Sequence, residues 1–497
     1  MWSGCELGCR PLSDQGCRFR MSVAYNIRDF MSAMCLRQRL LVTLMVSLVG
    51  LGGILYGYDI GVISGAMGLI DTYFKQHGHS LTNMQQGVIY GAVLAGGLLG
   101  TLIAGPMADR YGRRIAIIFA CLNFMLGIGL ITAATTFMSL LAARLVLGIA
   151  VGIVAVAIPL YVAELVSAEQ RGKYVAFFQL FLTSGILLAY VVDLGLVAGG
   201  HWRMMFAVVL IPTCILFLAM CFLPESPRWL WEQGKSALAR TVLLKTHTTA
   251  QTETALAEFA EQAAADQGSW RELFTGSTGF VLILAVAIAI LNQWTGINTF
   301  LQYAPSLLKS SGVNSSMQTA VGIPLLNLIC TLLALFLVDK IGRRVLLLVG
   351  VGGVFLAELF LGMVPYISTH MVASSNLMLY GFYAFISFFA IGPGVVIWLV
   401  VSELFPTRLR GKGIALCLFF NSLAGTILST LFLSIQSWLG VSGSYWLCAM
   451  FSLAYFVIVY CYLPETKGVS LEQIQHFFSM KGRGKTITLK EVDEALV

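Results

Sequence analysis

Charged residues are scarce in this chain of 497 residues: only 11% are Asp, Glu, Lys or Arg, against roughly 25% in a typical soluble domain. Proline is also scarce, at 12 residues, whereas 58% of the chain is hydrophobic. The eleven cysteines show no metal-binding or redox spacing, and most of those after residue 30 fall in apolar runs as small hydrophobic residues. This composition excludes an ordinary soluble domain and indicates a membrane protein with many spans.

Several functional classes lack support in the sequence. The net charge of +7 comes without a basic patch interleaved with aromatic residues, so we expect no nucleic-acid partner. We find no nucleophile–base pattern, metal cluster or phosphate-binding loop, so we expect no enzyme, no metal and no organic cofactor. Residues 1–39 lack the apolar core and cleavage site of a signal peptide, and we interpret them as a cytoplasmic extension.

Twelve apolar segments of roughly 20 to 29 residues are each long enough to cross a hydrocarbon core of about 30 Å. We place them at 41–70, 84–107, 115–135, 137–163, 174–198, 203–223, 280–308, 317–338, 344–365, 377–404, 412–436 and 443–463. The sequence thus predicts an all-α membrane protein with twelve transmembrane helices. We divide it into the extension, an N-terminal six-helix half (40–223), a linker with short amphipathic helices (224–279), a C-terminal six-helix half (280–463) and a cytoplasmic tail (464–497).

The basic residues set the expected orientation. Of the 31 Lys and Arg, 27 fall in the termini and in the even-numbered loops. Positive residues mark the cytoplasmic side of a membrane, so we expect both termini in the cytoplasm. Short loops and the lack of a targeting segment suit the plasma (inner) membrane of a bacterium.

Three charged motifs occur twice, in the same order and 230 to 240 residues apart. They are "DRYGRR" (109–114) and "DKIGRR" (339–344), "ELVSAEQRG" (164–172) and "ELFPTRLRG" (403–411), and "PESPR" (from 224) and "PETKG" (from 464). Ordered matches at nearly one offset indicate an internal repeat. Two parallel six-helix halves, with substrate bound near the midplane between them, are a known transporter plan.

These motifs, together with "GYDIGVISGA" in span 1, "RLVLGIAVG" in span 4 and "NQWTGIN" in span 7, resemble the sugar porter family of the major facilitator superfamily. The match runs from about residue 40 to 475 and is most similar to the bacterial proton-coupled members. The resemblance implies import of a monosaccharide together with a proton by alternating access. A proton-independent uniporter of a sugar or polyol, and a non-transporting sugar sensor, are the alternatives.

Charged residues of the repeated motifs are expected to form a gate network at the cytoplasmic mouth. Acids and arginines at helix ends form charge-assisted pairs, which would latch the two halves in the outward-facing state. By resemblance, the network contains Asp109, Arg113, Arg114, Glu164, Arg171, Glu225 and Arg228, and in the second half Asp339, Arg343, Arg344, Glu403, Arg410 and Glu465. Solvated helix ends that only orient the chain are the simpler alternative.

A sugar site needs amides, which donate and accept hydrogen bonds at once, and an aromatic platform. The candidate amides are Gln179, Asn292, Gln293, Asn298, Asn327 and Asn421, and the candidate platform is Trp398. Trp398 follows "GPG" at 392–394, where the helix is able to break. Helix–helix contacts are the alternative role for a single membrane amide. Asn292, Gln302 and Ser422 depart from residues common in relatives, so the sugar itself stays open.

Asp59 is the only charged residue between Leu40 and Ile70, and an acid there costs about 2.5–3.5 kcal/mol on insertion scales. Arg144 is the only basic residue deep in a span, and both lie in the outer half of the membrane. Burial favours a protonated acid, and a nearby arginine favours an ionised one. We therefore predict that Asp59 carries the coupling proton and pairs with Arg144. A static ion pair is the alternative.

Two further acids lie in or near spans. Glu358, in span 9, is outside the family pattern, and we expect it to face a neighbouring helix in its protonated form rather than to move protons. Asp193 lies near the outer end of span 5, where we expect an interfacial position. We expect the protein to work as a monomer in the lipid bilayer.

Overall fold

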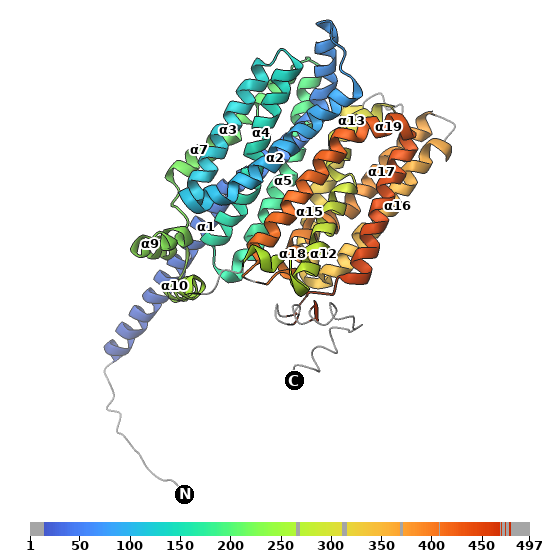
Figure 1. The fold of residues 1–497 in the computed structure, drawn as a ribbon. Coiled ribbons are helices and arrows are strands. Elements are labelled where there is room, and N and C mark those ends of the chain that lie inside the picture. Colours follow the sequence, from blue (N-terminus) through green and yellow to red (C-terminus); the bar gives the residue numbers. More distant parts are fainter. Residues whose placement is uncertain are drawn as a thin grey trace.

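The computed structural model describes the backbone of residues 14–264, 269–310, 316–367, 371–406 and 408–467, with residues 469, 473, 477 and 478 beyond them. Side chains are described from residue 40 onwards, without those of 168–173, 175–176, 262–264, 310, 316, 339 and 371–375. The regular elements described in these ranges are all helices, numbered α1 to α19 (Figure 1). These helices, taken singly or as two consecutive helices, form eleven segments that are long and apolar enough to span a membrane.

The N-terminal half contains six spans. They are α1 (Asp14–Gln76, apolar from Leu40), α2 (Asn83–Tyr111), α3 (Arg113–Ala133), α4 (Phe137–Leu165), α5 (Ala168–Val197), and α6 with α7 (Trp202–Ala207 and Leu210–Phe222). Thr82 and Thr136 begin α2 and α4, because each side chain accepts a hydrogen bond from the backbone N–H three residues on. Both helices thus start with a capping residue that satisfies a free donor.

The C-terminal half also contains six spans, but several are interrupted. Its helices are α12 and α13 (Gly276–Trp294 and Ile297–Ser310), α14 (Ser316–Ala320), α15 (Gly322–Ile341), α16 (Arg343–Ile367), α17 and α18 (Met371–Ile391 and Pro393–Leu404), and α19 (Arg410–Tyr462). Helix α19 holds the last two spans, because Gly440 leaves helical geometry with a φ of 75°. The eleven candidate spans therefore make twelve crossings.

Two spans break where glycine releases the helix. The predicted break in span 10 is present, since Gly392 is non-helical and Pro393 starts α18; proline has no N–H to continue the ladder. A second break, which the sequence did not predict, separates α12 from α13 inside "NQWTGIN". Gly296 has a φ of 82° there, a conformation that glycine adopts without strain.

Short helices join the halves at one end of the bundle. They are α8 (Pro227–Glu232), α9 (Ser236–Thr246), α10 (Thr249–Ala264) and α11 (Trp270–Leu273). We call this end, which also carries the repeated charged motifs, the linker end, and the other the opposite end. Figure 1 shows α9 and α10 below the N-terminal half, beside α1.

Apolar side chains cover the outside of the bundle as well as its interior. Phe222, Phe336 and Trp438 are 87%, 71% and 84% exposed. An exposed apolar surface of this extent marks a membrane-facing protein. Inside the bundle, small residues let helices approach: a Cβ on Gly148 would lie 2.3 Å from the carbonyl oxygen of Val93 on the neighbouring α2. Close backbone contact of this kind is typical of membrane helices.

Candidate functional site

Asp59 on α1 and Arg144 on α4 form an ion pair inside the N-terminal half. Arg144 Nη1 donates to Asp59 Oδ1 at 2.9 Å, and the two side chains are 0% and 3% exposed. The guanidinium lies 5.6 Å from the ring centre of Phe206, a cation–π contact. Asp59 Oδ2 has no hydrogen-bond partner in the described part of the chain. The two charges therefore meet, and one carboxylate oxygen is left to accept a proton; the coupling role itself stays a prediction.

Arg113 is the centre of the charged cluster at the linker end of the N-terminal half. Its Nη2 donates to Glu164 Oε1 at 3.1 Å, a charge-assisted hydrogen bond, and its Nε lies 3.0 Å from Oε2 as the second contact of the ion pair. The Ser226 hydroxyl donates to the same carboxylate. Asp109 is farther away, at 3.5 Å, and is 71% exposed. Glu164 and Ser226 thus fix Arg113, and Asp109 adds little because exposed pairs are weak.

Arg114 and Glu225 join the start of span 3 to the end of span 6. Glu225 accepts from the backbone N–H of Arg114 at 3.0 Å. The Arg114 guanidinium donates to the carbonyls of Met220 and Cys221 at 2.7 and 2.6 Å, in the last turn of α7. An acid at a helix start and a cation at a helix end both complement the helix dipole. The Glu225 carboxylate therefore binds the backbone at the start of α3, and its part in a network between the halves stays a prediction.

The second half repeats this geometry. Arg343 Nε lies 3.5 Å from Glu403 Oε1. Glu465 accepts from the backbone N–H groups of Arg343 and Arg344 at 2.8 and 3.1 Å. Arg344 Nη2 donates to the Tyr460 carbonyl at 2.6 Å, near the end of α19. The sequence repeat is thus a structural repeat, in which Glu465 also takes backbone partners in place of a guanidinium.

The other predicted network residues are less central. Arg228 pairs with Glu232 on its own helix at 3.1 Å, and Arg410 is half-buried at the first residue of α19. The side chains of Arg171 and Asp339 lie outside the described residues. Among the described residues, the motif ion pairs lie within one half or join it to the linker. A latch between the halves therefore stays a prediction for another conformation.

Part of the predicted sugar site is assembled around the break in span 7. Asn298 Nδ2 donates to Gln293 Oε1 at 2.8 Å, so the break brings these amides together. Gln293 also faces α19, since a Cβ on Gly425 would lie 3.2 Å from its Oε1. Asn421 is one turn before Gly425 and is buried. Amides from spans 7 and 11 thus share one interior region.

Unpartnered oxygens mark this region as polar. The Oδ1 atoms of Asn292 and Asn421 and the Oε1 of Gln302 are buried without a hydrogen-bond partner among the described residues. Buried polar atoms normally have partners, so these atoms are available to a ligand or water. Gln302 was noted in the sequence as a departure from relatives but was not among the candidate amides.

The remaining candidates come from three other helices. Gln179 on α5 and Trp398 on α18 are half-buried, and Asn327 on α15 is 6% exposed. No described hydrogen bond joins them to the span 7 cluster. Their role as sugar contacts stays a prediction.

At the opposite end the two halves are packed together. The rings of Tyr90 on α2 and Tyr303 on α13 have centres 3.8 Å apart, and the Tyr190 hydroxyl of α5 donates to the Leu301 carbonyl. A Cβ on Gly87 would lie 2.0 Å from the Thr430 carbonyl oxygen. The structure is therefore closed at the opposite end. Sequence reasoning did not find these tyrosines, because their signal is a contact between halves.

Two buried acids occupy different surroundings. Asp193 is 0% exposed and accepts from the Gly65 N–H at 3.0 Å, so the predicted interfacial position was wrong: α1 covers this side of α5. Glu358 on α16 is also 0% exposed and lies beside Ser452 and Cys448 of α19. It therefore faces a neighbouring helix, and its protonation stays a prediction.

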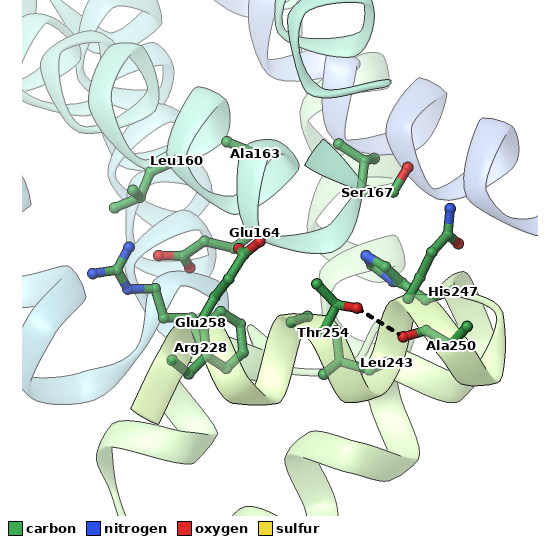
Figure 2. A pocket seen from close by; sticks show the side chains of 14 residues that line it. Leu160, Ala163, Glu164, Ser167, Arg228, Leu243, His247, Ala250, Thr254 and Glu258 are labelled. Carbon is green, nitrogen blue, oxygen red and sulfur yellow. Dashed lines mark hydrogen bonds between the residues drawn. The ribbon is translucent and has the colours of Figure 1, made fainter. Parts of the chain in front are cut away.

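A cavity of about 350 Å³ lies at the linker end, between the last turns of α4 and helices α9 and α10. Figure 2 shows Glu164 and Arg228 at its wall, opposite His247 and Thr254. The cavity adjoins the gate network, and no motif in the sequence had predicted it.

Comparison with known proteins agrees with this architecture. The family described as "Sugar (and other) transporter" matches residues 45–478. A glucose transporter, GlcP of Staphylococcus epidermidis, is 33% identical over 87% of this chain and 96% of its own. The arabinose-proton symporter of Escherichia coli is 32% identical over 91% of this chain and 97% of its own.

Among solved structures, the partially occluded inward open conformation of the xylose transporter XylE from E. coli superposes with a TM-score of 0.75. It is 27% identical and covers 86% of this chain and 99% of its own. The chain therefore belongs to the sugar transporter family of the major facilitator superfamily and is a multi-pass membrane protein.

Proposed function

We propose that this protein imports a monosaccharide together with a proton, by alternating access between two six-helix halves. The observation that carries the proposal is the buried ion pair of Asp59 and Arg144, in which one oxygen of the Asp59 carboxylate has no hydrogen-bond partner in the described part of the chain. The relationship to an arabinose-proton symporter supports it. We further propose that the linker end is cytoplasmic, that the membrane is the plasma (inner) membrane, and that the protein acts as a monomer.

The pair supplies a physical means of coupling. While the pair is intact, each charge stabilises the other in a region shielded from water. When a helix movement separates them, a bare carboxylate in the interior is costly, so Asp59 takes a proton, whereas Arg144 keeps its charge. A proton then accompanies each passage through the cycle, and no other cofactor is needed.

The sugar site is proposed at the amide cluster between the halves. Gln293, Asn298 and Asn421 offer both donors and acceptors, and the unpartnered oxygens of Asn292 and Gln302 are acceptors for sugar hydroxyls. With the opposite end closed, this conformation corresponds to release toward the linker end. Opening the tyrosine contacts at the opposite end would admit the next sugar.

Uptake into proteoliposomes tests the proposal. Labelled xylose, glucose, galactose, arabinose and myo-inositol are offered with and without an inward proton gradient. A gradient of one pH unit corresponds to about 1.4 kcal/mol per proton. A symporter that moves one proton with each sugar should therefore accumulate the sugar about tenfold at that gradient. Asp59→Asn should equilibrate or exchange the sugar without accumulating it.

Asp71→Asn is the matched control, because Asp71 lies on the same helix in an exposed pair with Lys75. It should accumulate sugar as the wild type does. If the wild type equilibrates a sugar and ignores the gradient, the protein is a uniporter and Asp59 is half of a structural ion pair. If no substrate crosses at all, transport of these sugars is refuted.

A further inference from the structure

Asp193 is a second buried acid of the N-terminal half, and the coupling pair does not use it. It is 0% exposed, its Oδ2 accepts from the Gly65 N–H at 3.0 Å, and its Oδ1 has no partner among the described residues. Gly65 lies six residues beyond Asp59 on α1, or about 9 Å along the helix axis. Asp193 therefore sits between the coupling pair and the opposite end.

A row of glycines brings α1 against α5 at this point. Gly57, Gly61 and Gly65 recur every fourth residue, so they share one face of α1. A Cβ on Gly65 would lie 2.6 Å from the Asp193 side chain, and one on Gly57 would lie 1.8 Å from the Leu182 carbonyl oxygen. The two helices thus enclose Asp193 so tightly that one backbone N–H is its only recorded hydrogen-bond donor in the described chain.

The groups that face Asp193 carry no charge. Tyr58 on α1 and Tyr190 on α5 are the titratable groups recorded beside it, and Tyr58 itself donates to the Met205 carbonyl of α6. No charged side chain described on the elements around it contacts the carboxylate. Ionisable side chains inside a membrane usually pair with one another or with backbone groups, and no cation in the described part of the chain pairs with Asp193.

Buried hydroxyl groups lie near both Asp193 and the coupling pair. Tyr190 lies beside Ser64, whose Oγ is buried without completing a hydrogen bond in the described chain. Tyr90 lies near both Tyr190 and Arg144. Tyr90, Tyr190 and Ser64 are each at most 4% exposed. Acids inside the membrane mark proton relays in transporters, and a hydroxyl group can both donate and accept a proton in a hydrogen bond.

The relay is interrupted in the present conformation. The Tyr190 hydroxyl donates a hydrogen bond to the Leu301 carbonyl of the other half, and the Tyr90 ring packs at a tilt against the ring of Tyr303 of that half. Separation of the halves at the opposite end removes both partners, so that the Tyr190 hydroxyl loses its acceptor and the Tyr90 ring loses its cover. A proton route that forms only when the opposite end is open would admit protons from that side alone. It would therefore not conduct protons across the membrane in the closed state.

We propose that Asp193 is the entry residue for protons arriving from the opposite end, passing them by way of Tyr190 and Tyr90 to Asp59. An external proton binds to the Asp193 carboxylate. Asp193 then gives up a proton and Asp59 gains one, so that Asp193 is again a carboxylate and Asp59 is neutral. This inference rests on the proposed proton symport, and Asp193 acts as a relay to Asp59 rather than as the coupling acid.

Asp193→Asn separates a relay from a structural role, because the Asn Oδ1 still accepts from the Gly65 N–H but the side chain cannot carry a proton. We expect the initial rate of gradient-driven sugar uptake to fall by roughly tenfold or more, while the final accumulation stays the same. The initial rate should approach that of the wild type as the external pH falls. Sugar counterflow without a gradient should keep its wild-type rate. Tyr190→Phe should give the same pattern, and Asp71→Asn should change nothing.

Three results would overturn the inference. A wild-type initial rate in both Asp193→Asn and Tyr190→Phe excludes a relay. An equal loss of counterflow and of gradient-driven uptake shows that Asp193 only fastens α1 to α5. Loss of the final accumulation, as expected of Asp59→Asn, makes Asp193 a coupling acid instead. Failure of the wild type to accumulate sugar is a different result: it refutes the proposed symport, and the relay with it.

Discussion

Gly87 of α2 is the point at which a single methyl group should change the conformational equilibrium of the transporter. A Cβ at this position would lie 2.0 Å from the backbone carbonyl oxygen of Thr430, on α19 of the other half. Real Cβ contacts below 3.0 Å are essentially never seen, so α2 and α19 would have to separate by about 1 Å or more. The obstacle is backbone, which cannot rotate away as a side chain does.

The magnitude follows from the cost of overpacking. An added methyl in a tight contact costs about 1–3 kcal/mol, and only in the state in which the opposite end is closed. The ratio of open to closed forms should therefore rise about 5- to 150-fold in Gly87→Ala. Net transport should fall, because the closed form is required in each cycle, while sugar binding from the opposite end should persist.

Distances between spin labels measure this shift. Labels at the exposed positions Asn83 and Ser437 report the separation of α2 and α19 at the opposite end, in a background whose other accessible cysteines are replaced by serine. Gly105→Ala is the matched control, because a Cβ at Gly105 meets no atom within 4 Å. If Gly87→Ala leaves both the label distance and the transport rate unchanged, the α2–α19 contact does not form the seal.

Three further outcomes are expected. Arg113→Ala leaves Glu164 buried without its guanidinium, so it should lower the free energy of unfolding in detergent by about 3–5 kcal/mol. Arg343→Ala should lower it by only about 1 kcal/mol, because the Arg343–Glu403 pair is longer and more exposed. Equal losses in the two variants would contradict this. Gly112→Ala should also destabilise the protein, by about 1–3 kcal/mol, because Gly112 has a φ of 101° and faces Glu225; an unchanged melting temperature would contradict it. Gln293→Ala should raise the KM for sugar uptake without abolishing accumulation, and an unchanged KM would remove Gln293 from the site.

Local patterns in the sequence were sufficient for the architecture. Hydropathy predicted the spans, since a length of about 20 apolar residues is what a bilayer requires. The repeated motifs predicted two matching halves, and the structure repeats the Arg113–Glu164 contact as Arg343–Glu403. The lone charges Asp59 and Arg144 also predicted their own pairing, because each has few alternatives in an apolar interior.

Tertiary structure decided which partners the other polar groups take. Glu225 and Glu465 accept hydrogen bonds from helix-start N–H groups, and the break at Gly296 brings Asn298 to Gln293. Asp193 became a buried acid only because the glycines of α1 allow α5 to approach closely. The seal of Tyr90 on Tyr303 joins residues more than 200 positions apart.

The physical reason is the range of the forces involved. Insertion into a membrane depends on the polarity of a continuous segment, which the sequence displays directly. Burial, hydrogen-bond partners and the closure of one end depend on how segments distant in the chain pack against one another. In this protein the order of polar and apolar residues was enough to predict the transporter fold and the pairing of Asp59 with Arg144. Which end is closed, and where a second acid is enclosed, followed from the packing of α1, α2 and α5 against their neighbours.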